Sequence, residues 1–286
     1  MTIESLQNLL GQYKLRPDKK FGQNFLLDDE VLDAMVEVAQ IGLQDTVIEV
    51  GPGIGNLTSK LAVRAGTVLA IEKDERLQPL LKDLSLRYKN VDVRFSDVLH
   101  FDFLDAMSRS GGGLVEPPVY KVVANIPYYV TGKIVQVFLR SPVRPRSITV
   151  LVQKEVAENM VAEPGSMNLL ALSVQLIGTP SLVRKVPANS FFPAPKVDSA
   201  VVHIDIPLIP LYGDVDEKAF FRVARACFAG KRKQIHNTLV SNLGLAPEIV
   251  DVVLNSVGID RTTRPQELSV ATFLSLANML KSQGLL

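Results

Sequence analysis

Cysteine is nearly absent from this sequence, which contains only Cys227. A single cysteine excludes an internal disulfide bond and fits a reducing compartment. The three histidines, His100, His203 and His236, are far apart, so neither residue type forms the spaced clusters typical of metal sites. The N-terminal residues lack the basic start and long apolar core of a secretory signal. These absences predict a cytoplasmic protein without a metal ion.

Long apolar runs and a marked excess of one charge are also missing. No run approaches the roughly 20 apolar residues that span a bilayer. Residues 169–177 form the longest candidate, but Ser173 and Gln175 interrupt it, which predicts a core helix and no membrane contact. The net charge of +1 does not by itself indicate a nucleic-acid partner. Basic residues do cluster at two places, and such clusters are often solvent-exposed without a binding role: Lys14, Arg16, Lys19 and Lys20, and Lys231, Arg232 and Lys233.

The apolar pattern alternates between short β-rich runs and segments with helical spacing. Runs typical of strands cover residues 46–50, 68–71, 91–95, 120–124 and 147–152, and helices are expected at 56–65 and 75–88. This alternation predicts an α/β fold with a mostly parallel sheet. Two later strands, 182–186 and 200–206, flank a proline-rich loop at 187–195. After residue 206 the pattern is helical (217–242, 247–256 and 266–282), which predicts two domains, 1–206 and 207–286.

A glycine-rich turn, Gly51-Pro52-Gly53-Ile54-Gly55, follows the first of these strands. Such a turn lets backbone N–H groups approach a ligand, and Glu72, about twenty positions later, can accept hydrogen bonds from ribose hydroxyls. The alternative is a purely structural turn, with Glu72 a surface cap. Asp97 follows the third strand at the same edge and could accept a hydrogen bond from an adenine amino group. The three features together favour a dinucleotide or S-adenosylmethionine, and nothing favours nicotinamide.

The tetrapeptide Asn125-Ile126-Pro127-Tyr128 follows the fourth strand. The exocyclic nitrogen of adenine is a poor nucleophile because its lone pair is delocalised into the ring. The Asn125 side-chain oxygen and a backbone carbonyl near Ile126 could accept both amino hydrogens, and Tyr128 could stack on the base. The alternatives are a turn cap for Asn125 and a core aromatic for Tyr128. Phe191 and Phe192 offer either a second stacking surface or apolar packing. Methyl transfer to a nucleobase nitrogen is the predicted chemistry.

At these residues the chain resembles the KsgA/RsmA family of rRNA adenine dimethyltransferases. The resemblance covers nearly the whole chain in these segments: KKFGQNFLLD (19–28), VIEVGPGIGNLT (47–58), AIEKD (70–74), SDVL (96–99), ANIPYYVTGKI (124–134), QKEVAE (153–158), FFPAPKVDSAVV (191–202), FAGKRKQIHNTL (228–239) and RPQELSVATFLSLAN (264–278). It implies a Rossmann-like methyltransferase domain that uses S-adenosylmethionine, followed by a small helical rRNA-binding domain. The implied substrate is a pair of adjacent adenosines near the 3′ end of small-subunit (16S) rRNA, dimethylated at N6 within an immature small ribosomal subunit. A monomer is expected.

The resemblance also implies roles for individual residues. Gln23, Asn24 and Leu26 would contact the methionine part of the cofactor, with Gly51 close to it. Glu72 would hold the ribose, and Asp97 and Val98 the adenine. The methyl-transfer site would be formed by Asn125, with Tyr128 and Phe191 around the target base. Phosphate contacts would come from Lys231, Arg232 and Lys233.

Two other functions remain open. An Erm-type enzyme, which methylates large-subunit rRNA and confers antibiotic resistance, would share the cofactor and the Asn-Ile-Pro-Tyr chemistry. The Gly-Pro-Gly-Ile-Gly form of the turn and the KRKQIHNTL stretch favour the small-subunit enzyme. A non-enzymatic alternative is an assembly factor that uses the same fold mainly to bind immature small subunits.

Overall fold

The computed structural model describes residues 1–110, 119–230 and 233–286. It divides into two compact units, one of Met1–Ala157 with Thr179–Ile206 and one of Glu158–Gly178 with Pro207–Leu286. The change of unit at residue 206 coincides with the expected boundary. Residues 158–178, which the sequence assigned to the first domain, belong instead to the helical unit. The reason is packing, because Met167 and Leu172 share a buried core with Phe220.

The first unit is built on a seven-stranded sheet in the order β4-β3-β2-β5-β6-β9-β7. Its strands are β2 (Thr46–Val50), β3 (Thr67–Glu72), β4 (Val91–Phe95), β5 (Tyr120–Asn125), β6 (Ser147–Gln153), β7 (Thr179–Val186) and β9 (Ser199–Asp205). The five strands from β4 to β6 are parallel, and β9 runs antiparallel to both β6 and β7. The expected α/β fold with a mostly parallel sheet is therefore confirmed.

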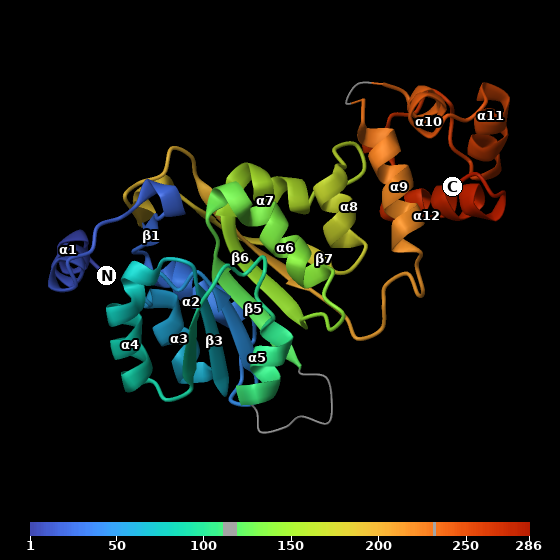
Figure 1. The fold of residues 1–286 in the computed structure, drawn as a ribbon. Coiled ribbons are helices and arrows are strands. Elements are labelled where there is room, and N and C mark those ends of the chain that lie inside the picture. The colour runs from blue at the N-terminus through green and yellow to red at the C-terminus, as the bar shows by residue number, and fades with distance from the viewer. Residues whose placement is uncertain (111–118, 231–232) are drawn as a thin grey trace. The chain divides into compact units, whose positions relative to one another are not determined.

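Helices cover both faces of this sheet (Figure 1). They are α2 (Asp29–Val38), α3 (Asn56–Arg64), α4 (Gln78–Arg87), α5 (Phe103–Ser110) and α6 (Thr131–Leu139). Coverage on both faces explains why the central strands are apolar almost throughout. Alternate residues of β5 show it: Val123 joins the core beneath α2 and α3, whereas the Tyr120 ring lies 5.8 Å from the ring of Phe103 in α5.

A small second sheet pairs β1 (Phe25–Leu26) with β8 (Phe191–Phe192), with Phe25 opposite Phe192. The sequence predicted only a proline-rich loop around β8. Helix α1 (Ile3–Gln12) precedes β1 and starts with a Thr2 cap. The pairing of β1 with β8 fixes the position of residues 23–26 within the first unit, where they line the site described below.

The helical unit contains α8 (Leu169–Gln175), α9 (Glu217–Phe228), α10 (Ile235–Leu243), α11 (Pro247–Ser256) and α12 (Val270–Ser282), and α7 (Lys154–Met160) crosses from the first unit into it. The single helix expected over 217–242 is wrong, because α9 ends at Phe228 and α10 begins at Ile235. The core of the helical unit is formed where α9 packs against α12, with the rings of Phe220 and Phe273 6.4 Å apart. Cys227 lies in this core, where burial raises its pKa to about 12, so it is an inert thiol.

Candidate active site

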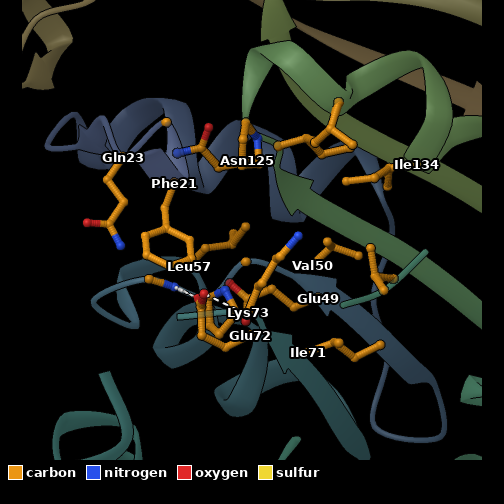
Figure 2. Close-up of a pocket in the computed structure, with 18 of the residues that line it drawn as sticks. Phe21, Gln23, Glu49, Val50, Leu57, Ile71, Glu72, Lys73, Asn125 and Ile134 are labelled. Atoms are coloured by element: carbon orange, nitrogen blue, oxygen red, sulfur yellow. Dashed lines mark hydrogen bonds between the residues drawn. The ribbon is translucent and has the colours of Figure 1, made fainter. Parts of the chain in front are cut away.

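A cavity of about 270 Å³ lies at the carboxyl ends of β2, β3, β4 and β5. In an open α/β sheet this edge is where ligands bind. Figure 2 shows Gln23 and Asn125 along one side of the cavity and Glu49, Glu72 and Lys73 along the other. Nine of the residues implied by the resemblance line it: Gln23, Asn24, Leu26, Gly51, Glu72, Asp97, Val98, Asn125 and Tyr128.

The glycine turn forms the floor between β2 and α3. Gly51, Gly53 and Gly55 have φ angles of +69°, +57° and +83°, a region that side chains disfavour. A Cβ atom at Gly55 would lie 2.8 Å from the Leu84 side chain. Helix α3 begins without a side-chain cap, so its first backbone N–H groups are free of a competing side chain at the cavity.

Glu72 connects this turn to the end of β3. Its carboxylate accepts a hydrogen bond from the Gly53 amide at 3.1 Å, and from the amides of Lys73 and Asp74 at 2.8 Å each. The side chain is 6% exposed, and burial raises its pKa while the backbone hydrogen bonds act in the opposite direction. The surface-cap alternative is therefore wrong, because Glu72 is buried, lines the cavity and fixes the shape of the glycine turn.

Asp97 provides a second acidic group at the end of β4. One carboxylate oxygen accepts from the Lys73 ammonium at 2.7 Å and the other from the Leu99 amide at 3.1 Å. The Lys73 hydrogen bond holds the pKa of Asp97 below its ordinary value. Asp97 is thus an ionised acceptor near neutral pH, next to the buried Val98.

The N-terminal side of the cavity depends on a polar network around Asp74. The Gln23 amide nitrogen donates to Asp74 at 2.7 Å, and its oxygen accepts from the Asp18 amide at 2.9 Å. Arg76 donates two further hydrogen bonds to Asp74, at 2.8 and 2.7 Å. Although burial opposes it, these hydrogen bonds lower the pKa of Asp74. The Gln23 side chain is therefore held in one orientation at the cavity wall.

Asn125 ends β5 beside the glycine turn. A Cβ atom at Gly51 would lie 3.9 Å from the Asn125 backbone oxygen, so the two motifs adjoin. In the regions of chain that the structure describes, no hydrogen bond occupies the Asn125 side-chain amide. The carbonyl of Pro127, by contrast, accepts from the Val130 amide and the Thr131 hydroxyl. Asn125 therefore presents an unoccupied amide to the cavity, which a turn cap would not do.

Tyr128 has one end anchored in the protein and a ring at the cavity. Its hydroxyl lies 2.6 Å from the hydroxyl of Ser199 in β9. Burial raises the pKa of Tyr128, an effect that the Ser199 hydrogen bond reduces, so the phenol stays protonated near neutral pH. This arrangement suits a positioned ring and not a general base.

Phe191, which the resemblance places around the target base, is buried in this structure. It is 3% exposed, belongs to the core with Leu26 and Leu151, and is not among the residues lining the cavity. Strand pairing with β1 directs it inward. Phe192 packs in the neighbouring cluster around Leu6 and Leu77. In this structure both side chains therefore pack against apolar neighbours.

The basic cluster of the helical unit is only partly described. Lys231 and Arg232 lie outside the described residues. Lys233 is exposed and sits in a bend before α10, so this residue is not part of the helix expected over 217–242.

Several cavity residues were not anticipated from the sequence. Lys73 pairs with Asp97, and Lys133 comes from α6. Tyr129, 64% exposed, shares the cavity with Tyr128. Glu49 is a buried carboxyl within an otherwise apolar strand. An acidic residue in the run TVIEV was the available signal for it.

No group of three or more candidate metal-binding side chains occurs among residues 1–110, 119–230 and 233–286. Over those residues, no helix is long and apolar enough to cross a bilayer.

Comparison with known proteins identifies the family. Residues 15–282 match the family model "Ribosomal RNA adenine dimethylase". The chain is 40% identical to the ribosomal RNA small subunit methyltransferase A of Dehalococcoides mccartyi strain CBDB1, over 94% of this chain and 90% of that protein. It is 39% identical to the protein of the same name from Alkaliphilus oremlandii, over 96% and 95%.

Solved structures agree with this assignment. A dimethyladenosine transferase from Plasmodium falciparum superposes with a TM-score of 0.77 at 26% identity, covering 91% of this chain and 98% of that one. The 23S rRNA methyltransferase ErmE gives a TM-score of 0.70, also at 26% identity, over 90% and 100%. The fold is therefore shared with a dimethyladenosine transferase and with a 23S rRNA methyltransferase. With a family model matching nearly its whole length, the chain belongs to the ribosomal RNA adenine dimethylase family of Rossmann-like, S-adenosylmethionine-dependent methyltransferases.

Proposed function

We propose that this protein dimethylates N6 of two adjacent adenosines near the 3′ end of small-subunit rRNA, acting as a cytoplasmic monomer on an immature small subunit. The observation that carries the proposal is the unoccupied Asn125 amide directly beside the glycine turn, in one cavity. Relatives named for the small subunit support this substrate over the large subunit.

In the proposed binding mode, the cofactor extends along the whole cavity. Gln23, Asn24 and Leu26 bind the methionine part, and Gly51 lets it approach the backbone. The ribose hydroxyls bond to Glu72, and the adenine lies against Asp97 and Val98. Two features support this placement: Asp97 is ionised and so accepts from an amino group, and Gln23 is held at the cavity wall by Asp74.

The proposed chemistry is positioning with electrostatic assistance. The Asn125 oxygen and a carbonyl near Ile126 accept hydrogen bonds from the adenine amino group, while the Tyr128 ring stacks on the base. The nitrogen lone pair then forms the new N–C bond as the C–S electron pair returns to sulfur. The methylated amine becomes acidic and loses its proton afterwards, so no strong base is needed. The protonated Tyr128 phenol agrees with this scheme.

The decisive experiment is transfer of labelled methyl groups from S-adenosylmethionine to small ribosomal subunits that lack the modification, with large subunits as the comparison. We expect N6,N6-dimethyladenosine in the small subunit alone. Label in the large subunit would support the Erm-type function. No label in either, with cofactor binding demonstrated, would refute the enzymatic proposal.

The assembly-factor alternative is separated from catalysis by Asn125→Ala. This variant should lose methyl transfer by about 100-fold or more, since a positioned acceptor for the transition state is removed, while binding small subunits normally. Asn255→Ala, at an exposed position in α11, is the matched control and should retain both properties. If Asn125→Ala loses particle binding together with activity, Asn125 is not the positioning group.

We further propose that the helical domain, residues 207–286, contacts rRNA phosphates through Lys231, Arg232 and Lys233. Exposure of Lys233 supports this role. Charge reversal at Lys231 and Lys233 should weaken particle binding and flatten its salt dependence, because fewer counterions are released. The matched control reverses the exposed Lys82 and Lys89 of the first unit. Equal losses in both double variants would show a general charge effect without a specific contact.

A further inference from the structure

Glu49 has no role in the site as described so far, although it lies within it. The residue occupies the interior of β2, is 1% exposed and lines the cavity (Figure 2). Its Oε2 atom makes no hydrogen bond of ordinary geometry among the described residues, although the Thr58 hydroxyl, which also lacks such a bond, lies close enough to interact with the carboxyl. A buried acceptor without a partner is costly, and native proteins retain such groups where a ligand completes them.

Neither of the charged residues at the end of β3 supplies a cation to Glu49. Glu72, the ionisable neighbour on β3, is itself acidic and has its oxygens on three backbone amides. Lys73 is paired with Asp97. Burial raises the pKa of Glu49 to about 8; the Thr58 hydroxyl lowers it in part, and the charge of Glu72 adds to the rise. Glu49 is therefore mostly protonated at neutral pH in the protein alone.

We propose that Glu49 ionises when S-adenosylmethionine binds and so makes the pocket prefer this cationic cofactor to its uncharged-sulfur product, S-adenosylhomocysteine. The inference rests on the assignment of this cavity as the cofactor pocket. The two molecules differ by the methyl group and by the positive charge on sulfur, and share all their other ionisable groups. A buried carboxylate is stabilised by a nearby cation, which only the cofactor provides at that sulfur.

The charges balance over one reaction. Binding of the cofactor releases the Glu49 proton to solvent, and the carboxylate offsets the sulfonium. Methyl transfer converts the sulfonium to a neutral thioether, and the methylated amine loses one N–H proton. The carboxylate then regains a proton, so Glu49 no longer offers the product a charge. Product release is favoured by the same residue that favours cofactor binding.

The test is binding of each molecule to the purified full chain as a function of pH, without rRNA. The ratio of the Kd for S-adenosylhomocysteine to that for S-adenosylmethionine should rise about 20-fold between about pH 6.5 and about pH 8.5. The α-amino group titrates in the same range but is common to both molecules, so it cancels in the ratio. Calorimetry at neutral pH in buffers of different ionisation enthalpy should show nearly one proton released per cofactor, and none per product.

Glu49→Gln should abolish the proton release and make the ratio of the two Kd values independent of pH, because the amide cannot ionise. Glu75→Gln, at an exposed position in the segment after β3, should leave both unchanged. A wild-type ratio that is constant with pH, or cofactor binding without proton release, would overturn the proposal even if Glu49→Gln fails to fold. Because rRNA is absent from the assay, a wrong rRNA substrate would not affect the result, whereas failure of the chain to bind either molecule would refute the cofactor pocket itself.

Discussion

The hydroxyl of Tyr128 can be removed without removing its ring, which separates two possible roles of this residue. In Tyr128→Phe the ring stays at the cavity and the 2.6 Å contact with Ser199 is lost. Since Tyr128 is protonated near neutral pH, we expect the hydroxyl to hold the ring in place and to take no part in proton transfer.

The size of the effect on stability follows from burial. Ser199 is fully buried, so Tyr128→Phe leaves its hydroxyl without a partner, at a cost of about 1–3 kcal/mol in unfolding free energy. Ser199→Ala leaves the half-buried Tyr128 hydroxyl, which solvent can partly satisfy, and should cost about 1 kcal/mol. The double variant should cost less than the sum, with a coupling of about 1 kcal/mol.

The effect on catalysis discriminates between the roles. If the ring is what matters, Tyr128→Phe should retain methyl transfer to within a few-fold, whereas Tyr128→Ala should lose about 10- to 100-fold through lost stacking. Denaturant unfolding and single-turnover methyl transfer are the two assays, and Tyr88→Phe, away from the cavity, is the hydroxyl-removal control. A loss of about 100-fold or more in a stably folded Tyr128→Phe would refute the argument, because that is the size expected for a proton-transfer group.

Three further changes test the packing of the fold and the surroundings of the site. Gly66→Ala places a Cβ atom 2.5 Å from a backbone carbonyl oxygen and should lower the unfolding free energy by about 1–3 kcal/mol, whereas Gly11→Ala, with nothing within 4 Å, should not destabilise. Lys73→Met removes the partner of Asp97, whose pKa should rise toward its ordinary value in an NMR titration; an unchanged pKa would contradict the pairing. Relative to wild type, Glu49→Gln should raise the unfolding free energy of the ligand-free protein, and the difference should grow as pH rises from about 4.5 to about 8. The full difference, measured by thermal or denaturant unfolding, should be on the order of 4 kcal/mol. The sign follows because the raised pKa makes the folded state bind the extra proton over that range, so wild-type stability falls with pH, and a pH-independent difference would contradict the assignment.

Much of the site was predictable because its signals are local. The strands ending near Gly51, Glu72, Asp97 and Asn125 are short apolar runs, and parallel strands place their carboxyl ends at one edge. The cofactor contacts near the N-terminus were predicted from the family resemblance alone, because no periodicity of apolar residues indicated them. Helix ends were less predictable: the segment at 75–88 starts with a short 3-10 turn, Glu75–Leu77, before α4.

Only the tertiary structure decided how the remaining residues are used. Pairing of β1 with β8 turned Phe191 into the core, and long-range packing on Phe220 assigned residues 158–178 to the helical unit. The sequence by itself determined the sheet, the glycine turn and the edge where they meet, because hydrophobic period and backbone freedom are properties of neighbouring residues. The raised pKa values of Glu49 and Glu72 come from the fold alone, because burial and hydrogen bonding depend on atoms that are distant along the chain.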